Sequence, residues 1–244
     1  FLLSIINFFL FLGDIYSFGF NHKYYIYIIM YLNDKKNDKY MYNWLICMFI
    51  LVASIIVIGG LTRLTDSGLS ITKWEPFKGF FPPLSSSEWN NYFNLYKQIP
   101  EYKLQNFNMS LNDFKIIFWW EWGHRFLGRL IGLTFLIPLI YFTFYKGFKK
   151  TIVYHLIFIL ICFQGLIGWF MVKSGLVERV DVSHFRLSLH LTIAFVILSL
   201  ILWQILKFNK LNETNNQYIE YNIPKIFLFF IFLQIIFGAF VSGM

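Results

Sequence analysis

The chain has 244 residues, of which 57% are hydrophobic and only 14% are charged, and its formal net charge at pH 7 is +8. So apolar a composition, with the apolar residues gathered in long blocks, excludes an ordinary soluble domain and indicates an integral membrane protein. The positive charge does not indicate nucleic-acid binding, because no polar segment has a basic run with interleaved aromatic residues. The two cysteines, Cys47 and Cys162, lie in separate apolar blocks and support neither a disulfide framework nor a thiolate metal site.

The chain begins at Phe1 and stops at Met244 in or just after an apolar run. We therefore expect a fragment at both ends, inactive by itself. Residues 1–43 form an N-terminal region to which the sequence assigns no role. Its last part, 33–43, is expected to be a polar linker, because charged and amide side chains dominate it.

Five apolar blocks approach or exceed the about 20 residues that cross a hydrocarbon core. The segments that join them on one side are rich in lysine, and the positive-inside rule places these segments on the matrix or cytoplasmic side. The sequence thus predicts an all-α integral membrane protein: an antiparallel four-helix transmembrane bundle over 44–207, then an inner loop and the first helix of a second, truncated bundle over 208–244. The predicted spans are 44–62, 116–145, 152–172, 187–206 and 226–244.

The first outward segment, 63–117, is long for a connection, and loops of this length in compact proteins are usually functional or disordered. Its tryptophans and prolines argue against disorder. Ser85, with Glu88 three residues later, matches a capping box. We therefore expect a short surface helix over 86–98.

The sequence WWEWGHRFLGR, at 119–129, places four ionisable groups at the start of the second apolar block: Glu121, His124, Arg125 and Arg129. Such groups are costly in hydrocarbon, so they indicate a functional site. In a helix, Glu121, His124, Gly128 and Gly132 would share one face. That face would present a carboxylate, an imidazole and a flat glycine strip against which a planar group could lie.

The fourth block begins with a similar combination, in which Arg186 lies one helical turn before His190. Two membrane histidines on two helices, with arginines near them, predict bis-imidazole ligation of a haem iron. The arginines, with Arg63, are candidate contacts for the propionates or the pocket. Two alternatives stay open: each histidine could be a hydrogen-bonded core residue, and Arg63 could be an interfacial anchor. Zinc is disfavoured, because no third histidine or cysteine shares that depth.

Five segments in order carry a resemblance to a known family. They resemble the haem A synthase family, in its mitochondrial and alphaproteobacterial branch, over about residues 43–244. The segments are GGLTRLTDSGLSITKW at 59–74, PP-x4-EW at 82–89, EWGHRFLGRLIG at 121–132, CFQGLIGWFMVKSGL at 162–176 and RLSLH at 186–190.

The resemblance implies an oxidoreductase that oxidises the C8 methyl group of haem O to the formyl group of haem A, for cytochrome c oxidase biogenesis. It implies eight transmembrane helices in two halves, each with a histidine pair. His124 and His190 would ligate the iron of the substrate haem O, and Glu121 would be the catalytic carboxylate near the reacting methyl. Haem b is expected in the half that lies beyond this sequence.

The resemblance also implies a multi-pass protein of the mitochondrial inner membrane, or of the plasma membrane in a prokaryote. The implied partners are haem O, the lipid bilayer, haem O synthase, an electron donor and a second copy of the chain. Residue patterns alone leave alternatives: a b-type membrane cytochrome that passes electrons to or from quinone, and a haem-free assembly scaffold. Glu121 could likewise be a structural partner of Arg125 or Arg63.

Overall fold

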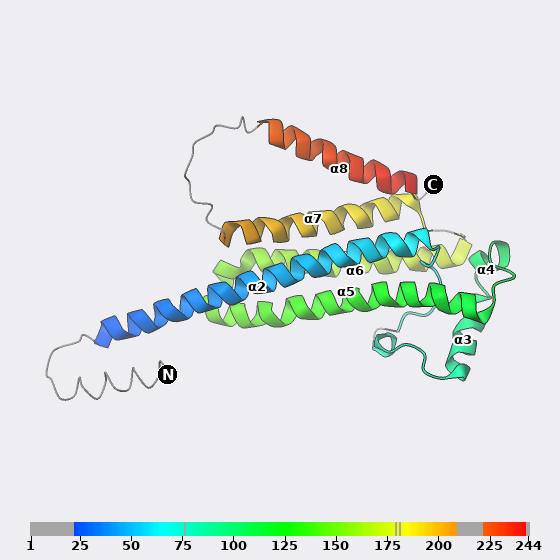
Figure 1. The fold of residues 1–244 in the computed structure, drawn as a ribbon, viewed down its shortest axis with the longest axis horizontal. Helices are drawn as coiled ribbons and strands as arrows, with labels where there is room; N and C mark the ends of the chain where they lie inside the picture. The colour runs from blue at the N-terminus through cyan, green and yellow to red at the C-terminus, as the bar shows by residue number, and fades with distance from the viewer. Residues whose placement is uncertain (1–21, 76, 179, 181, 209–221, 243–244) are drawn as a thin grey trace. The chain divides into compact units, whose positions relative to one another are not determined.

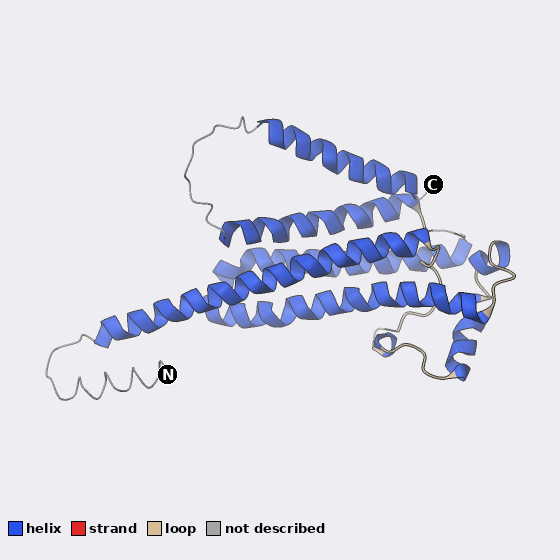
Figure 2. Cartoon of the chain, in the orientation of Figure 1, coloured by secondary structure: helices blue, strands red, loops and turns tan. Residues whose placement is uncertain are grey.

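The computed structural model describes residues 22–75, 77–178, 180, 182–208 and 222–242, and the regular elements in these ranges are all helices (Figures 1 and 2). The chain divides into two compact units, 1–43 and 44–244. The elements in chain order are α2 (His22–Leu64), the 3-10 helix η1 (Lys78–Phe80), α3 (Ser86–Tyr96), α4 (Pro100–Leu104), α5 (Leu111–Lys146), α6 (Phe148–Glu178), α7 (His184–Phe208) and α8 (Asn222–Ser242).

The N-terminal unit contains the first part of α2, and the predicted polar linker over 33–43 is wrong, because α2 runs through it without a break. Exposed polar side chains are compatible with a helix when they face solvent. Lys36 and Tyr40 also lie one turn apart, with the Lys36 Nζ 5.9 Å from the centre of the Tyr40 ring. The polar composition of 33–43 is therefore that of a helical segment and not of a linker.

Four helical segments are long and apolar enough to cross a membrane: Lys36–Leu64, Leu111–Lys146, Phe148–Leu176 and His184–Phe208. This confirms the predicted all-α membrane protein that crosses the bilayer several times. The fifth predicted span falls in α8, and Leu228–Val241 is the apolar part of this helix among the described residues. α8 packs against α7, where the Ser188 hydroxyl donates to the Ile236 carbonyl at 3.2 Å.

The bundle core is built by large side chains from neighbouring helices. α5 packs against α6, and α6 packs against α7 (Figure 1). Trp44 of α2 donates from Nε1 to the Thr134 carbonyl of α5 at 3.0 Å, and its ring contacts Phe135 and Tyr154. Burying such aromatic side chains contributes strongly to packing. α2 is thereby fixed against α5 and α6.

The loop between α2 and α5 forms a small packed layer of its own. α3 begins as predicted: the Ser85 side chain accepts from the Glu88 amide, and the Glu88 carboxylate accepts from the Ser85 amide. α5 begins earlier than predicted, at Leu111, with a second capping box from Ser110 and Asp113. Its first turns supply Phe114, Ile117 and Phe118 to a buried cluster with α3. The extra length of α5 is used to anchor this loop.

Candidate functional site

Glu121 is 3% exposed and binds the loop rather than pointing into open space. Its Oε2 accepts from the Ser70 hydroxyl at 2.6 Å and from the Ile71 amide at 2.7 Å. Its Oε1 accepts from Arg125 Nη2 at 2.5 Å, one turn along α5. All three partners donate, so the site suits an ionised carboxylate.

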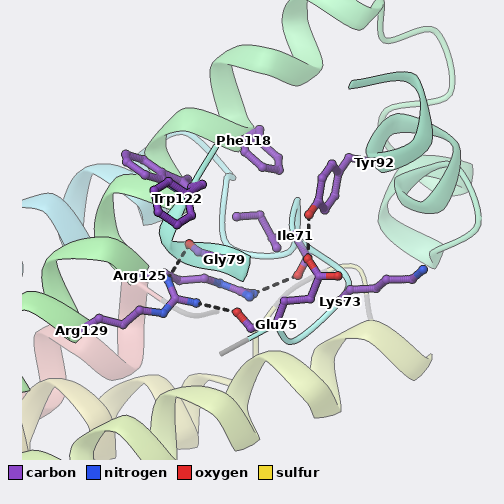
Figure 3. A pocket seen from close by; sticks show the side chains of 10 residues that line it. Ile71, Lys73, Glu75, Gly79, Tyr92, Phe118, Trp122, Arg125 and Arg129 are labelled. Atoms are coloured by element: carbon purple, nitrogen blue, oxygen red, sulfur yellow. Dashed lines mark hydrogen bonds between the residues drawn. The ribbon is translucent and has the colours of Figure 1, made fainter. Parts of the chain in front are cut away.

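The two arginines that follow on α5 hold the same loop through its backbone (Figure 3). Arg125 also donates to the Ile71 carbonyl at 2.9 Å. Arg129 donates to the Gly79 carbonyl at 3.0 Å and to the Glu75 carbonyl at 3.4 Å. α5 is therefore attached to the loop at three successive levels.

A small pocket lies between α5 and this loop, and Figure 3 shows Arg125 and Arg129 at its wall. Trp122 also lines it, and its buried Nε1 has no hydrogen-bond partner within the described ranges. Across the pocket, the Tyr92 hydroxyl donates to Glu75 at 2.8 Å. Burial and this carboxylate raise the pKa of Tyr92 to about 12, so the phenol stays a neutral donor.

His124, one turn beyond Glu121, lies against α2. An ideal Cβ on Gly59 would be 3.1 Å from the His124 Nε2. That distance is shorter than ordinary van der Waals contact, so a Cβ at this position would displace the imidazole by a few tenths of an ångström. The neighbouring Gly60 differs, because no described atom lies within 4 Å of its ideal Cβ.

His190 of α7 lies against α6 in a similar way. An ideal Cβ on Gly168 would be 3.0 Å from the His190 Cε1. Gln164, one turn away on α6, donates from Nε2 to the His190 carbonyl at 2.8 Å. The His190 Nδ1 is buried and has no hydrogen-bond partner among the residues that the structure describes.

His124 and His190 lie on two different helices, α5 and α7, and each contacts a glycine of a neighbouring helix. The donor set fits a haem iron: two imidazoles, glycine contacts beside both, and one ring nitrogen without a partner. No group of three or more potential ligands for a bare metal ion occurs in the described part of the chain. His155, by contrast, lies within hydrogen-bonding distance of Thr151 and Thr143, so it is a structural residue.

The other two candidate arginines lie apart from the contacts of Arg125 and Arg129. Arg63, at the end of α2, pairs with Asp66 at 3.5 Å. Arg186, at the start of α7, donates to the Ser174 hydroxyl and lies over the Phe170 ring. Glu121 therefore pairs with Arg125, which is one of the two structural partners that the sequence left open. The other, Arg63, pairs with Asp66.

The expected glycine strip on α5 is only partly open. At Gly128 the space beside an ideal Cβ is occupied by Ile55 of α2, at 3.6 Å, whereas at Gly132 no described atom lies within 4 Å. The glycines that contact the imidazoles are on the other helices, α2 and α6. The sequence signals for them were the Gly59-Gly60 pair and the Gln164-Gly165 and Gly168 spacing, which indicate close helix approach but not what approaches.

Comparisons with known proteins show which family this chain resembles. Residues 42–244 match the family model described as Cytochrome oxidase assembly protein. A Heme A synthase from Pelagibacter ubique is 52% identical over 223 residues, which cover 88% of this chain and 64% of the relative. Heme A synthases from Parvibaculum lavamentivorans and Maricaulis maris are each 46% identical, over 82% and 83% of this chain and 59% and 60% of the relatives.

The chain thus spans about three fifths of the length of the curated relatives it matches. No solved structure matches it significantly. The family match covers most of the chain, including every candidate residue on α5 and α7. The chain therefore belongs to the cytochrome oxidase assembly family that includes these haem A synthases.

Proposed function

We propose that this chain supplies the substrate-binding half of a haem A synthase, which oxidises the C8 methyl group of haem O to a formyl group for cytochrome c oxidase biogenesis. The observation that carries the proposal is that His124 and His190, on separate helices that can cross a membrane, each contact a glycine of a neighbouring helix. The relatives that bear the name Heme A synthase support the reaction.

His124 and His190 would hold the iron of the substrate haem O. Neutral imidazole is the ligating form, and their position inside apolar helices favours it. The substrate iron supplies the redox chemistry when haem is bound. The task of the chain is to fix the two rings and to keep the site dry.

Glu121 would stabilise positive charge that develops near the oxidised methyl. Its two oxygens already accept three hydrogen bonds, one of them from Arg125. This bonding holds the carboxylate in one orientation beside the proposed substrate site. The carboxylate also fixes the 70–71 backbone one turn from His124, so its role would combine electrostatics with positioning.

Arg125 and Arg129 are the stronger propionate candidates of the four arginines. Arg129 binds only backbone carbonyl oxygens in the contacts described above, and exchange of a neutral carbonyl for a carboxylate would add an ion pair to these hydrogen bonds. Arg63 and Arg186 stay candidates for the pocket wall. We also propose that the full-length protein binds a second haem, haem b. Its proposed partners are haem O synthase, an electron donor or a second copy of the chain.

The proposed location is the mitochondrial inner membrane, or the plasma membrane if the source is prokaryotic. The four helices that can cross a membrane support a multi-pass position. The relatives named above are bacterial.

Pigment analysis of the full-length protein tests this function. The wild type should co-purify with haem O and its oxidised products. His124→Ala and His190→Ala should each lower substrate haem at least tenfold, because each removes an iron ligand. His155→Ala is the matched control, since it removes a membrane histidine held by threonines. Equal losses in all three variants would refute the ligand assignment.

The type of haem that co-purifies with the protein distinguishes the proposed enzyme from a second candidate function. The same imidazole pair suits a b-type membrane cytochrome, which would retain unmodified protohaem only. A protein without a Soret band would instead be a scaffold. Haem O or haem A in the wild type therefore separates the proposed enzyme from both.

A further inference from the structure

Each candidate ligand contacts a different neighbouring helix at a glycine, where an added Cβ would crowd the imidazole ring. His124 of α5 meets Gly59 of α2, and His190 of α7 meets Gly168 of α6. The closest approaches to an ideal Cβ are 3.1 Å and 3.0 Å. A methyl group at either position would press on the ring itself, because these contacts are with imidazole atoms.

These contacts are specific to two glycines and not to glycine-rich helices in general. Gly60 follows Gly59 on α2, and Gly165 precedes Gly168 on α6. At both neighbours no atom of the described residues lies within 4 Å of an ideal Cβ. Each helix therefore carries one glycine whose side of the backbone faces an imidazole, and another that faces open space.

Gln164 adds a second contact from α6 to the same ligand. Its Nε2 donates to the backbone carbonyl of His190 at 2.8 Å, whereas its buried Oε1 finds no partner in the part of the chain that the structure describes. α6 thus touches His190 at two levels, at the ring through Gly168 and at the backbone through Gln164. Together they restrict the rotation of the ring and the sliding of α7 along α6.

We propose that Gly59, Gly168 and Gln164 are positioning residues that set the orientation of the two imidazoles. The proposal rests on the proposed function, in which the imidazoles are axial ligands. Two helices would then carry the ligands, and the other two helices of the bundle would orient them. Outer contacts of this kind around metal ligands commonly change affinity by about 10- to 100-fold when they are removed.

The experiment compares matched glycine variants of the full-length protein: Gly59→Ala with Gly60→Ala, and Gly168→Ala with Gly165→Ala. The readouts are the low-temperature EPR g-values of the oxidised haem, which depend on the relative orientation of the two imidazole planes, and the rate of haem loss to apomyoglobin. We expect shifted g-values and about tenfold faster haem loss in Gly59→Ala and Gly168→Ala. Gly60→Ala and Gly165→Ala should resemble the wild type.

Gln164→Leu provides a second test that does not add volume beside a ring. It should shift the haem midpoint potential and the g-values, because the carbonyl of His190 loses its contact with α6. Gln204→Leu is the control, since Gln204 is also a buried glutamine, on α7. Thermal unfolding of each variant shows whether it is folded before its spectrum is compared.

The outcomes separate the inference from the function on which it rests. If the wild type lacks a bis-imidazole haem that depends on His124 and His190, the ligand assignment of the proposed function fails. If that haem is present but folded Gly59→Ala and Gly168→Ala match their neighbours, only the positioning role is refuted. Equal disturbance by both members of each glycine pair would also refute it, because general helix packing would then explain the effect.

Discussion

Two regions of the bundle differ in how their polar groups are paired. One is the loop end of α5, with Glu121, Arg125 and Arg129, and the other is the histidine level, with His124 and His190. At the loop end, Glu121, Arg125 and Arg129 bind the backbone or side chains of residues 70–79. At the histidine level, the His190 Nδ1 is buried without a hydrogen-bond partner among the described residues. Buried polar groups are normally paired. The first region is thus held by donors and acceptors of the chain itself, whereas the second leaves a buried ring nitrogen without a described partner, next to the haem that we propose.

The largest expected effect comes from Glu121→Ala, which removes a carboxylate from the loop end of α5. It leaves the partly buried Arg125 and two loop donors without this acceptor, and breaking a buried ion pair costs about 3–5 kcal/mol. The free energy of unfolding of the haem-free protein should fall by that order. Glu121→Gln should cost less, because the amide keeps one acceptor oxygen, yet it should stop conversion of haem O with haem still bound.

The matched variant for the unpaired region is His190→Leu. In the haem-free protein it removes a buried ring nitrogen that has no described partner, so its unfolding free energy should stay within about 1 kcal/mol of the wild type. Chemical denaturation measures both variants. A large loss for His190→Leu together with a small loss for Glu121→Ala would reverse the comparison between the two regions. Unchanged haem A yield in Glu121→Gln would remove the catalytic assignment.

A smaller effect should separate Arg129 from Arg63. Arg129→Met removes charged hydrogen bonds to two loop carbonyls and should cost about 1.5–3 kcal/mol. Arg63→Met removes a pair with Asp66, whose side chain is 71% exposed, and should cost about 0–1 kcal/mol. Hydrogen exchange over residues 71–81 should quicken in the first variant only. Equal exchange would show that Arg129 does not hold the loop.

Helix α3 gives a milder test of the loop. Ser85→Ala removes the side chain that accepts from the Glu88 amide, and loss of such a cap costs about 1 kcal/mol. Ser87→Ala, at an exposed position inside the same helix, is the control. Amide exchange near 86–89 should rise for Ser85→Ala alone. Local opening should leave the haem spectrum unchanged, because α3 contacts neither histidine in the packing described above.

The smallest effect is a pH dependence of the loop. The pKa of Tyr92 is raised from 10.0 to about 12, so the folded state holds the phenol proton more tightly than the unfolded state. Its contribution to stability is complete below about pH 10 and is lost as the pH rises towards 12. Tyr92→Phe should weaken this alkaline decline in stability. The decline should not disappear, because burial also raises the pKa of Tyr96. An identical decline in the variant would exclude Tyr92 as a source.

Much of the fold follows from local patterns. The membrane-crossing helices have long apolar blocks, and the start of α3 has both members of its capping box, so each could be predicted from neighbouring residues. The segment 33–43 is helical although its polarity predicts a linker, because a solvated helix face tolerates polar residues. The local signal was hydrophobicity, and it does not distinguish a polar helix from a loop.

The site was predictable only in part, for a related reason. Ionisable residues are conspicuous in apolar blocks, so Glu121, His124 and His190 could be predicted as site residues. Arg125 lies one turn from Glu121, but other partners are a backbone amide and glycines, such as Ile71 and Gly168, from segments distant in sequence. A backbone group has no sequence signature, and glycine is ambiguous. The contacts therefore emerge only when the helices are packed together.

The stretch from Gly59 to Ile71 reaches α5 twice, first at the imidazole of His124 and then at the carboxylate of Glu121. Between these points the chain is tightened by a turn in which Asp66 has φ 47° and the Ser67 amide donates to the Thr62 carbonyl at 2.9 Å. The stretch thus works as a spacer of fixed length. An inserted or deleted residue inside it would put one contact out of register with the other, so homologues that retain both groups should tolerate substitutions there far better than changes of length.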